Sequence, residues 1–269
     1  VPAKRLPGLE QHYASRLHVF TSSTLAYFFM NTQVRPFNKV AVRRAVNYAI
    51  SRKWLVRLAG GLARPTENIL PPDYPSYRRH TLYPHNMRMA KRLVAASGER
   101  GARVTVWNHD LPGDRPFTEY LISVLDELGF RARERVVTAS DYWATLSDPS
   151  TRPKPQIGFA DWVQDYPHPL DWFGVLLDGQ TATARSDNYA HFDVPRVTRE
   201  IESLTRQPKL TAPVDARWRR LDRQVMKLAP WVPFLNPEGV DFFSARVRPQ
   251  CYVNNVLYGF DYASVCVGK

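Results

Sequence analysis

The sequence predicts an α/β protein, in which strands and helices alternate along the chain. Two strand-like segments, 104–107 and 130–137, enclose the segment 117–128, whose apolar residues recur at helical spacing. A short helix over 140–146 and a strand over 156–160 continue this alternation, which is typical of parallel strands joined by right-handed crossovers. The 269 residues suffice for a sizeable core, and no apolar run reaches the ~18 residues that a membrane-spanning helix needs.

The chain before this alternating unit contributes a strand and two helices. The aromatic run 25–31 is typical of a buried strand. Over residues 41–58, apolar residues recur at helical spacing while arginine, asparagine and serine occupy the opposite face, which predicts one helix with a solvated polar side. Prolines and the lack of periodicity make 62–85 a long ordered loop. Asn86 is then expected to cap a helix that ends at Gly98.

The chain after residue 160 reads as a loop followed by helices. Apolar periodicity predicts helices over 169–177, 194–204 and 212–228. A short buried strand is expected over 231–235, because five successive residues there are apolar or proline. Turns and short strands are expected from there to the end of the chain.

The two cysteines, Cys251 and Cys266, both lie in the last twenty residues. Two cysteines on a hairpin-sized segment predict a local disulfide and an exported protein. A pair of buried thiols is the alternative. Two sulfurs with no nearby Cys or His partner make a poor zinc site, so no metal is predicted there.

Positive charge is concentrated in the first part of the chain. Residues 1–105 hold 18 Lys and Arg against 4 Asp and Glu, a net charge of +14, whereas residues 106–269 hold 19 against 21, a net charge of −2. A basic segment of this kind suits an anionic partner or an ordinary solvated surface rich in arginine. No zinc-finger spacing, recognition helix or aromatic–basic RNA motif accompanies it, so nucleic acid is not expected as a partner.

One segment, 161–173, gathers three carboxylates, two tryptophans and a tyrosine just past the strand predicted over 156–160. Ligands of open α/β sheets bind beyond the carboxyl ends of the strands. A carboxylate beside a tryptophan can hold a ligand ammonium group, which favours a binding site. Two alternatives stay open: a helix cap with core aromatics, and a hydrolase in which Asp161 and Asp165 form an acid/base pair.

The loops and motifs of common enzymes are missing from the sequence. It contains no GxxxxGK[ST], no GxGxxG between a strand and a helix, no GxSxG and no HExxH. The sequence therefore predicts no catalytic residue, no metal and no cofactor.

Five segments in chain order resemble the conserved blocks of one family. They are the segment NTQVRPFNKVAVRRAVNYAISR at 31–52, the proline turn 70–72, the helices at 86–98 and 117–129, and the motif WVQDYPHP at 162–169. In this order they are similar to the extracytoplasmic solute-binding proteins of ABC transporters, family 5, which bind oligopeptides, dipeptides and nickel chelates.

The resemblance implies a lobe of the periplasmic-binding-protein type (type II), with a mixed sheet flanked by helices. Family members are about twice as long and close two lobes on a ligand, so the chain resembles their C-terminal half. Residues 1–30 are then a lead-in and hinge, 31–240 the α/β lobe, and 241–269 a return segment that belongs to the other lobe. An extracytoplasmic location, permease subunits and the N-terminal lobe as partners are implied as well.

The resemblance also implies site residues. In peptide-binding relatives the aspartate of the DYP motif pairs with the α-ammonium group of the ligand, which here is Asp165, with Trp162, Tyr166 and His168 around it. His168 departs from the family, which usually has an acidic residue there. The function expected is capture of peptides for import without catalysis. A nickel-chelate or other solute, suggested by His168 and His191, and a regulatory sensor on the same fold are the alternatives.

Overall fold

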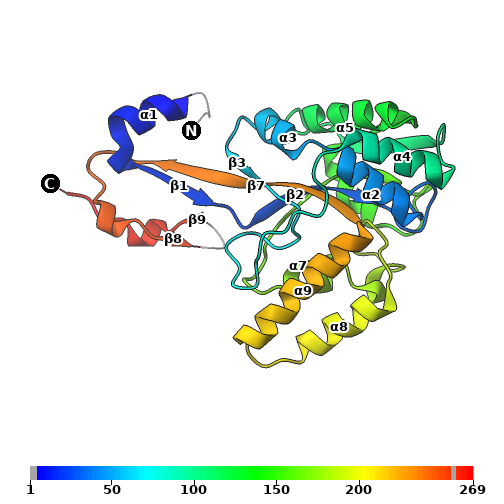
Figure 1. Ribbon diagram of the computed structural model, residues 1–269. Helices are drawn as coiled ribbons and strands as arrows, with labels where there is room; N and C mark the ends of the chain where they lie inside the picture. Colours follow the sequence, from blue (N-terminus) through cyan, green and yellow to red (C-terminus); the bar gives the residue numbers. More distant parts are fainter. Residues whose placement is uncertain (1–4, 256–258, 269) are drawn as a thin grey trace.

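The computed structural model describes residues 5–255 and 259–268 (Figure 1). One seven-stranded sheet runs through it, in the order β1-β7-β2-β6-β4-β5, with β3 paired to β7. Its strands are β1 (Leu17–Thr21), β2 (Thr24–Met30), β3 (Ala63–Pro65), β4 (Arg103–His109), β5 (Arg131–Val137), β6 (Ile157–Val163) and β7 (Trp231–Phe242). β4 pairs parallel with β5 and β6, and the other pairs are antiparallel, so the sheet is mixed as predicted.

Helices cover both faces of the sheet (Figure 1). They are α2 (Val40–Ala49), α3 (Arg52–Leu58), α4 (Met87–Ser97), α5 (Arg115–Glu127), α6 (Ala139–Ser147), α7 (Leu170–Leu176), α8 (Pro195–Thr205) and α9 (Ala212–Leu228). Apolar residues of α2, α4 and α5 form one core cluster, and those of α7, α8 and α9 form the other. The α/β architecture that the alternation predicted is confirmed.

Strand β2 supplies side chains to both cores. Its sequence TLAYFFM is buried throughout. Tyr27 and Phe29 point into the cluster of α7–α9, whereas Phe28 and Met30 point into the cluster of α2–α5, because alternate residues of a strand face opposite sides. Burying one such phenylalanine stabilises the fold by about 1.5–3 kcal/mol.

The helix predicted over 41–58 is in fact two helices, α2 and α3. Ser51 separates them and its hydroxyl accepts a hydrogen bond from Trp54 N (3.4 Å). The expected solvated face was also wrong, because Arg43, Asn47 and Arg52 are buried.

The physical reason is that these three side chains donate to backbone carbonyls where α9 leads into β7. The Arg43 guanidinium donates to Leu228 O (2.7 and 3.0 Å), and Asn47 Nδ2 donates to Trp231 O (2.9 Å). Arg52 Nε lies 2.8 Å from Pro233 O. Buried carbonyls need such donors.

Other boundaries differ where strand pairing extends an element. β6 continues to Val163 and β7 to Phe242, beyond the ends predicted at 160 and 235. The lead-in contains a helix, α1 (Leu6–Tyr13), and the strand β1. The helix capped by Asn86 and ended by Gly98 in the left-handed conformation is confirmed, with Asn86 Oδ1 accepting from Met89 N (2.9 Å).

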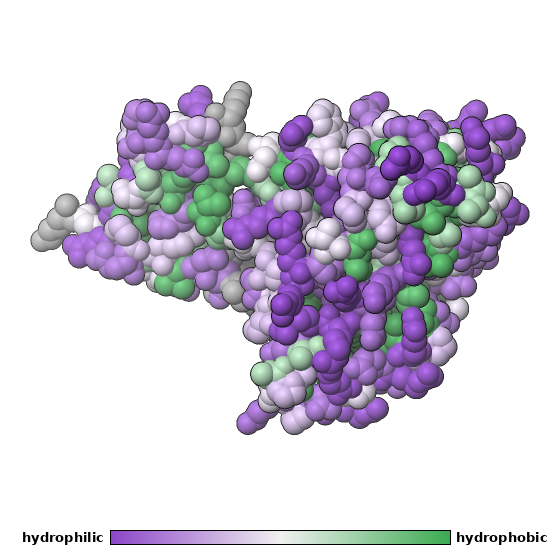
Figure 2. All heavy atoms as spheres, in the orientation of Figure 1, coloured by the Kyte–Doolittle hydropathy of each residue, from purple (hydrophilic) through white to green (hydrophobic). Residues whose placement is uncertain are grey.

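A two-stranded extension of β1 and the last part of β7 projects away from α2–α9, with α1 beside it (Figure 1). One face of it is covered by the C-terminal segment, where the Tyr252 ring stacks on His18 (3.8 Å between centroids). Hydrophobic residues are visible in Figure 2 between α1 and the C-terminal segment. On the face of β1 opposite to His18, Val19 is 46% exposed.

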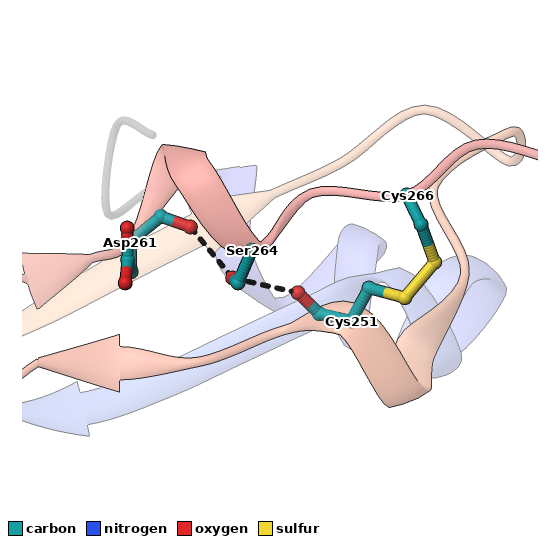
Figure 3. Close-up of a disulfide and its surroundings, with 4 residues drawn as sticks. All are labelled: Cys251, Asp261, Ser264 and Cys266. Carbon is teal, nitrogen blue, oxygen red and sulfur yellow. Dashed lines mark hydrogen bonds between the residues drawn. A yellow bond between two sulfur atoms is a disulfide. The ribbon is translucent and has the colours of Figure 1, made fainter.

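The predicted disulfide between Cys251 and Cys266 is confirmed and closes the C-terminal segment (Figure 3). The Ser264 hydroxyl lies 3.0 Å from Cys251 O and 2.7 Å from Asp261 O. The short strands β8 (Asn254–Asn255) and β9 (Gly259–Phe260) pair within the same segment. Among the described residues, no helix has the length and apolar character to cross a membrane.

Gly158 allows β6 to lie close to its neighbours, and this gives a first prediction. A Cβ at this position would lie 2.6 Å from Trp107 O and 2.8 Å from Phe29 Cε1. We expect Gly158→Ala to lower the free energy of unfolding by about 1–3 kcal/mol in urea denaturation. Gly113→Ala is the control, because nothing lies within 4 Å of its Cβ position. Equal stability of the two variants would contradict the packing described here.

Candidate functional site

The candidate site is built where β6 ends and turns into α7. Trp162 lies within β6, opposite Leu25 of β2, so it belongs to the strand and does not follow it as predicted. Gln164 N donates to Ser23 O (3.1 Å), which extends the contact between these two chain segments by one step. The motif therefore begins from a rigid, central strand of the sheet.

Asp171, in the first turn of α7, holds the motif together. Its Oδ2 accepts hydrogen bonds from Trp162 Nε1 (3.2 Å) and from the backbone N of Asp165 (3.0 Å). The Asp171 side chain is buried, and its Oδ1 has no hydrogen-bond partner within the described part of the chain. Burial raises the pKa of Asp171, although the hydrogen bonds from Asp165 N and Trp162 oppose that shift.

A second set of hydrogen bonds fastens the proline-rich loop to the same place. Trp172 Nε1 donates to the Tyr74 hydroxyl (2.8 Å), which donates to Gln164 Oε1 (2.7 Å). The Ser23 hydroxyl also donates to the Asp73 carboxylate. Side-chain hydrogen bonds thus tie together four segments: Ser23 just before β2, residues 73–74 of the loop, the end of β6 and the start of α7. These bonds limit the positions that Asp165 can take.

The structure brings Asp165 and Trp162 together through Asp171, with the Asp165 side chain exposed. Tyr166 is 39% exposed and lines a hollow of about 430 Å³ with residues of α7 and α8. His168 instead packs edge-on against Trp218 (6.0 Å between centroids). Its Nδ1 accepts from Leu170 N (3.0 Å) and burial lowers its pKa.

Asp161 belongs to a different group from Asp165. It lies two residues after Phe159 on the same face of β6, opposite to that of Trp162. Burial raises the pKa of Asp161, Asp114 raises it further and His109 lowers it. His109 Nε2 lies 3.3 Å from Asp114 Oδ2, so these two residues form the polar surroundings of Asp161.

The two histidines that suggested a chelate each use a ring nitrogen locally. His168 contacts Leu170 N, and His191 Nδ1 lies 2.6 Å from Ala182 O. Over residues 5–255 and 259–268, no group of three or more His, Cys, Asp or Glu side chains is placed to hold a metal ion.

The main residue that the sequence did not single out is Asp171. It was one carboxylate of three in the segment 161–173, with no role assigned. The available signal was its position, because a charged residue between Leu170 and Trp172 falls on the buried side of a short apolar helix. Tyr74 and Gln164 carried no comparable signal.

A mixed sheet covered by helices on both faces, with a projecting pair of strands, is the fold that this chain shares with solved periplasmic binding proteins. Residues 1–184 match the model of the bacterial extracellular solute-binding proteins, family 5 Middle. The chain belongs to this family.

Individual relatives are more distant. The chain is 26% identical over 249 residues to heme-binding protein A of Haemophilus influenzae, covering 88% of this chain and 43% of that protein. It is 22% identical over 249 residues to the glutathione-binding protein GsiB of Salmonella typhimurium, covering 89% of this chain and 47% of that protein. The chain thus spans about half the length of these relatives.

Solved structures show the same fold. HbpA2 from Haemophilus parasuis superposes with a TM-score of 0.87 at 18% identity, over 99% of this chain and 52% of that one. The periplasmic binding protein DppA from Helicobacter pylori, in complex with the peptide STSA, gives a TM-score of 0.78 at 20% identity, over 92% and 48% of the two chains.

The buried Asp171 carboxyl gives a prediction on stability and pH. Because its pKa is raised in the folded state, the folded protein binds this proton more tightly than the unfolded chain does. Its contribution to the free energy of unfolding therefore falls as pH rises from about 4, the ordinary aspartate range, through the raised pKa. Asp171→Asn keeps an acceptor oxygen, so we expect it to remove this slope and to match or exceed the wild-type stability at pH 7.

Asp171→Ala removes the acceptor and leaves Trp162 Nε1 and Asp165 N without it. We expect a loss of about 1–3 kcal/mol at pH 7. Urea denaturation between pH 4 and 8 measures both variants, with Asp141→Asn on the exposed side of α6 as control. Equal losses for the Asn and Ala variants, with the wild-type slope retained, would show that Asp171 does not act as described.

Proposed function

We propose that this chain is the ligand-binding lobe of an ABC-importer solute-binding protein that captures peptides or other small solutes carrying a free ammonium group. Asp165 is the anchor for that ammonium group, with Trp162 beside it. The protein binds and releases its solute without catalysing a reaction. It acts outside the cytoplasm and delivers the solute to permease subunits.

The observation that carries this proposal is the Asp165 carboxylate, exposed while its backbone is fixed by the buried Asp171. A carboxylate in open water gains little from pairing with an ammonium group. The free energy gained from this pairing rises when a second protein surface closes over the carboxylate and excludes water, as happens in ligand clefts. The adjacent indole of Trp162 adds an apolar wall and a face that attracts cations.

The proposal includes a division of the chain. Residues 1–30 serve as lead-in and hinge, 31–240 as the lobe, and 241–269 as a return segment that packs on an opposing N-terminal lobe. The exposed hydrophobic face of the β1–β7 extension, with Val19 at its surface, supports such a partner surface. The ligand would favour the closed arrangement of the two lobes.

The proposal defines the solute only by its chemical class. Relatives are named for heme and glutathione, and solved neighbours for peptides, among them a dipeptide-binding protein in complex with Met-Leu. Peptides and glutathione carry a free α-ammonium group, whereas hemin does not. An ammonium anchor at Asp165 would therefore suit peptides and glutathione but not hemin.

Asp165→Asn tests the anchor in the longest natural polypeptide that contains this chain. Calorimetric titration with di- to hexapeptides, the same peptides N-acetylated, glutathione and hemin identifies the solute. We expect only ligands with free amines to bind, and Asp165→Asn to weaken them by about tenfold or more, the loss of one charge-assisted hydrogen bond.

Asp141→Asn, which also removes one exposed aspartate charge, serves as control and should bind like the wild type. Binding of N-acetylated peptides as tight as that of free ones would remove the anchor role. Binding of hemin alone, unaffected by Asp165→Asn, would replace the peptide proposal with a tetrapyrrole one. No heat from any solute would favour the sensor alternative.

A further inference from the structure

A second cavity lies apart from the candidate site, between the start of α3 and the segment 79–85. Its volume is about 390 Å³, near the lower end of the ~300–1,000 Å³ range of small-molecule pockets. Residues 65–67, which begin at the last residue of β3, form another wall. None of Trp162, Asp165 or Tyr166 lines it. Apart from Tyr83, its ionisable lining residues are Arg52, Lys53, Glu67, Arg79, His80 and His85.

The charge of this lining is positive. Two cations, Lys53 and Arg79, are exposed side chains at its edge, and Arg52 is buried in its wall. The one carboxylate, Glu67, is already occupied: its Oε2 accepts from Leu82 N (2.5 Å) and Tyr83 N (2.9 Å), and its Oε1 lies 3.9 Å from Arg52 Nη1. Glu67 thus balances Arg52 and leaves the charges of Lys53 and Arg79 uncompensated within the lining.

His80 adds an independent observation. Its side chain is only 7% exposed, and its Nε2 lies 3.3 Å from Asp222 Oδ1. Asp222 also accepts from Asn68 Nδ2 (2.9 Å) and Ile69 N (3.1 Å), so an ionised Asp222 acts as acceptor and His80 Nε2 as donor. The other ring nitrogen, Nδ1, is buried and has no hydrogen-bond partner among the residues that the structure describes.

Because His80 Nε2 donates to Asp222, Nδ1 of the neutral ring is an acceptor, and among the described residues it has no donor. An acceptor without a donor in the wall of a positively charged cavity indicates a missing hydroxyl or other donor group. A hydroxyl group of a bound anion would donate to His80 Nδ1 while Lys53 and Arg79 neutralise the charge of the anion.

We propose that this cavity is a binding site for a small organic anion that carries a phosphate or carboxylate group. Lys53 and Arg79 pair with the anionic group, and His80, held by Asp222, accepts a hydrogen bond at Nδ1 from a hydroxyl of the ligand. The site is separate from Asp165, so it can be occupied whether or not the solute site is filled.

The test uses the same polypeptide as above, with inorganic phosphate and malate, which both carry a hydroxyl, titrated at constant ionic strength set with sodium chloride. We expect saturable binding of at least one of them in calorimetry. A phosphate-only result identifies a phosphoryl ligand, and a malate-only result a carboxylate ligand. NMR of the imidazole nitrogens should show the His80 Nδ1 signal shifting along the same titration.

The double variant Lys53→Ala/Arg79→Ala should weaken this binding by about tenfold or more, because two charged partners are lost. The control Arg88→Ala/Lys91→Ala removes two exposed cations of α4 that do not line the cavity, and it should bind like the wild type. Asp165→Asn should also leave it unchanged.

Three results would overturn the proposal. The first is that neither phosphate nor malate binds saturably. The second is that both double variants weaken binding equally, which would mean that net charge alone attracts the anion. The third is that binding persists without any change in the His80 signal. Circular dichroism of each variant confirms that it is folded before binding is measured.

Discussion

The central constraint on this protein is that strand β2 has no polar face. Every residue from Thr24 to Met30 is buried, so the sheet must be covered by helices on both sides and β2 must lie between other strands. Its two neighbours are β6 and β7, and both pairings are antiparallel. The first fixes the position of the strand that carries Trp162. The second begins the long strand β7, which continues out of the lobe into the extension. The candidate site and the extension thus both follow from the placement of one apolar strand.

The candidate site depends on a carboxylate that does not itself reach solvent. Asp171 loses hydration on burial, and that loss raises its pKa. The Asp171 carboxylate fixes the positions of two groups, because its Oδ2 accepts hydrogen bonds from the indole N–H of Trp162 and from the backbone N–H of Asp165. A binding residue held by a fixed backbone loses less conformational entropy when a ligand binds than one on a free loop. The burial of Asp171 therefore lowers the stability of the protein, while its hydrogen bonds preorganise the binding residues.

The sequence was sufficient to predict the α/β class, most elements and the disulfide, because these depend on local periodicity and spacing. It was misleading at the helix 41–58, where arginine and asparagine indicated a solvated face. Arg43 and Arg52 are buried where they donate to carbonyls 185 and 181 positions away, contacts that no local pattern reveals. Within the site, Asp165 and Trp162 were selected by motif, but whether they bind a ligand remains a proposal. Asp171 could not be assigned a role, because that role depends on how β6 and α7 meet in three dimensions.

The same reasoning applies to the basic first part of the chain. A net charge of +14 over residues 1–105 suggested either an anionic partner or a solvated surface. In the structure, the Lys and Arg residues of this part of the chain have different roles. Some have partners within the protein, such as the buried Arg43, which donates to carbonyls, and the exposed Lys39, which lies 2.6 Å from the buried Glu99. Others, Lys53 and Arg79, stand at the edge of a cavity whose only carboxylate is occupied. Net charge alone therefore cannot locate an anion site. The relevant feature is which cations remain uncompensated next to a cavity that also offers a buried polar group, and Lys53 and Arg79 have that position beside His80.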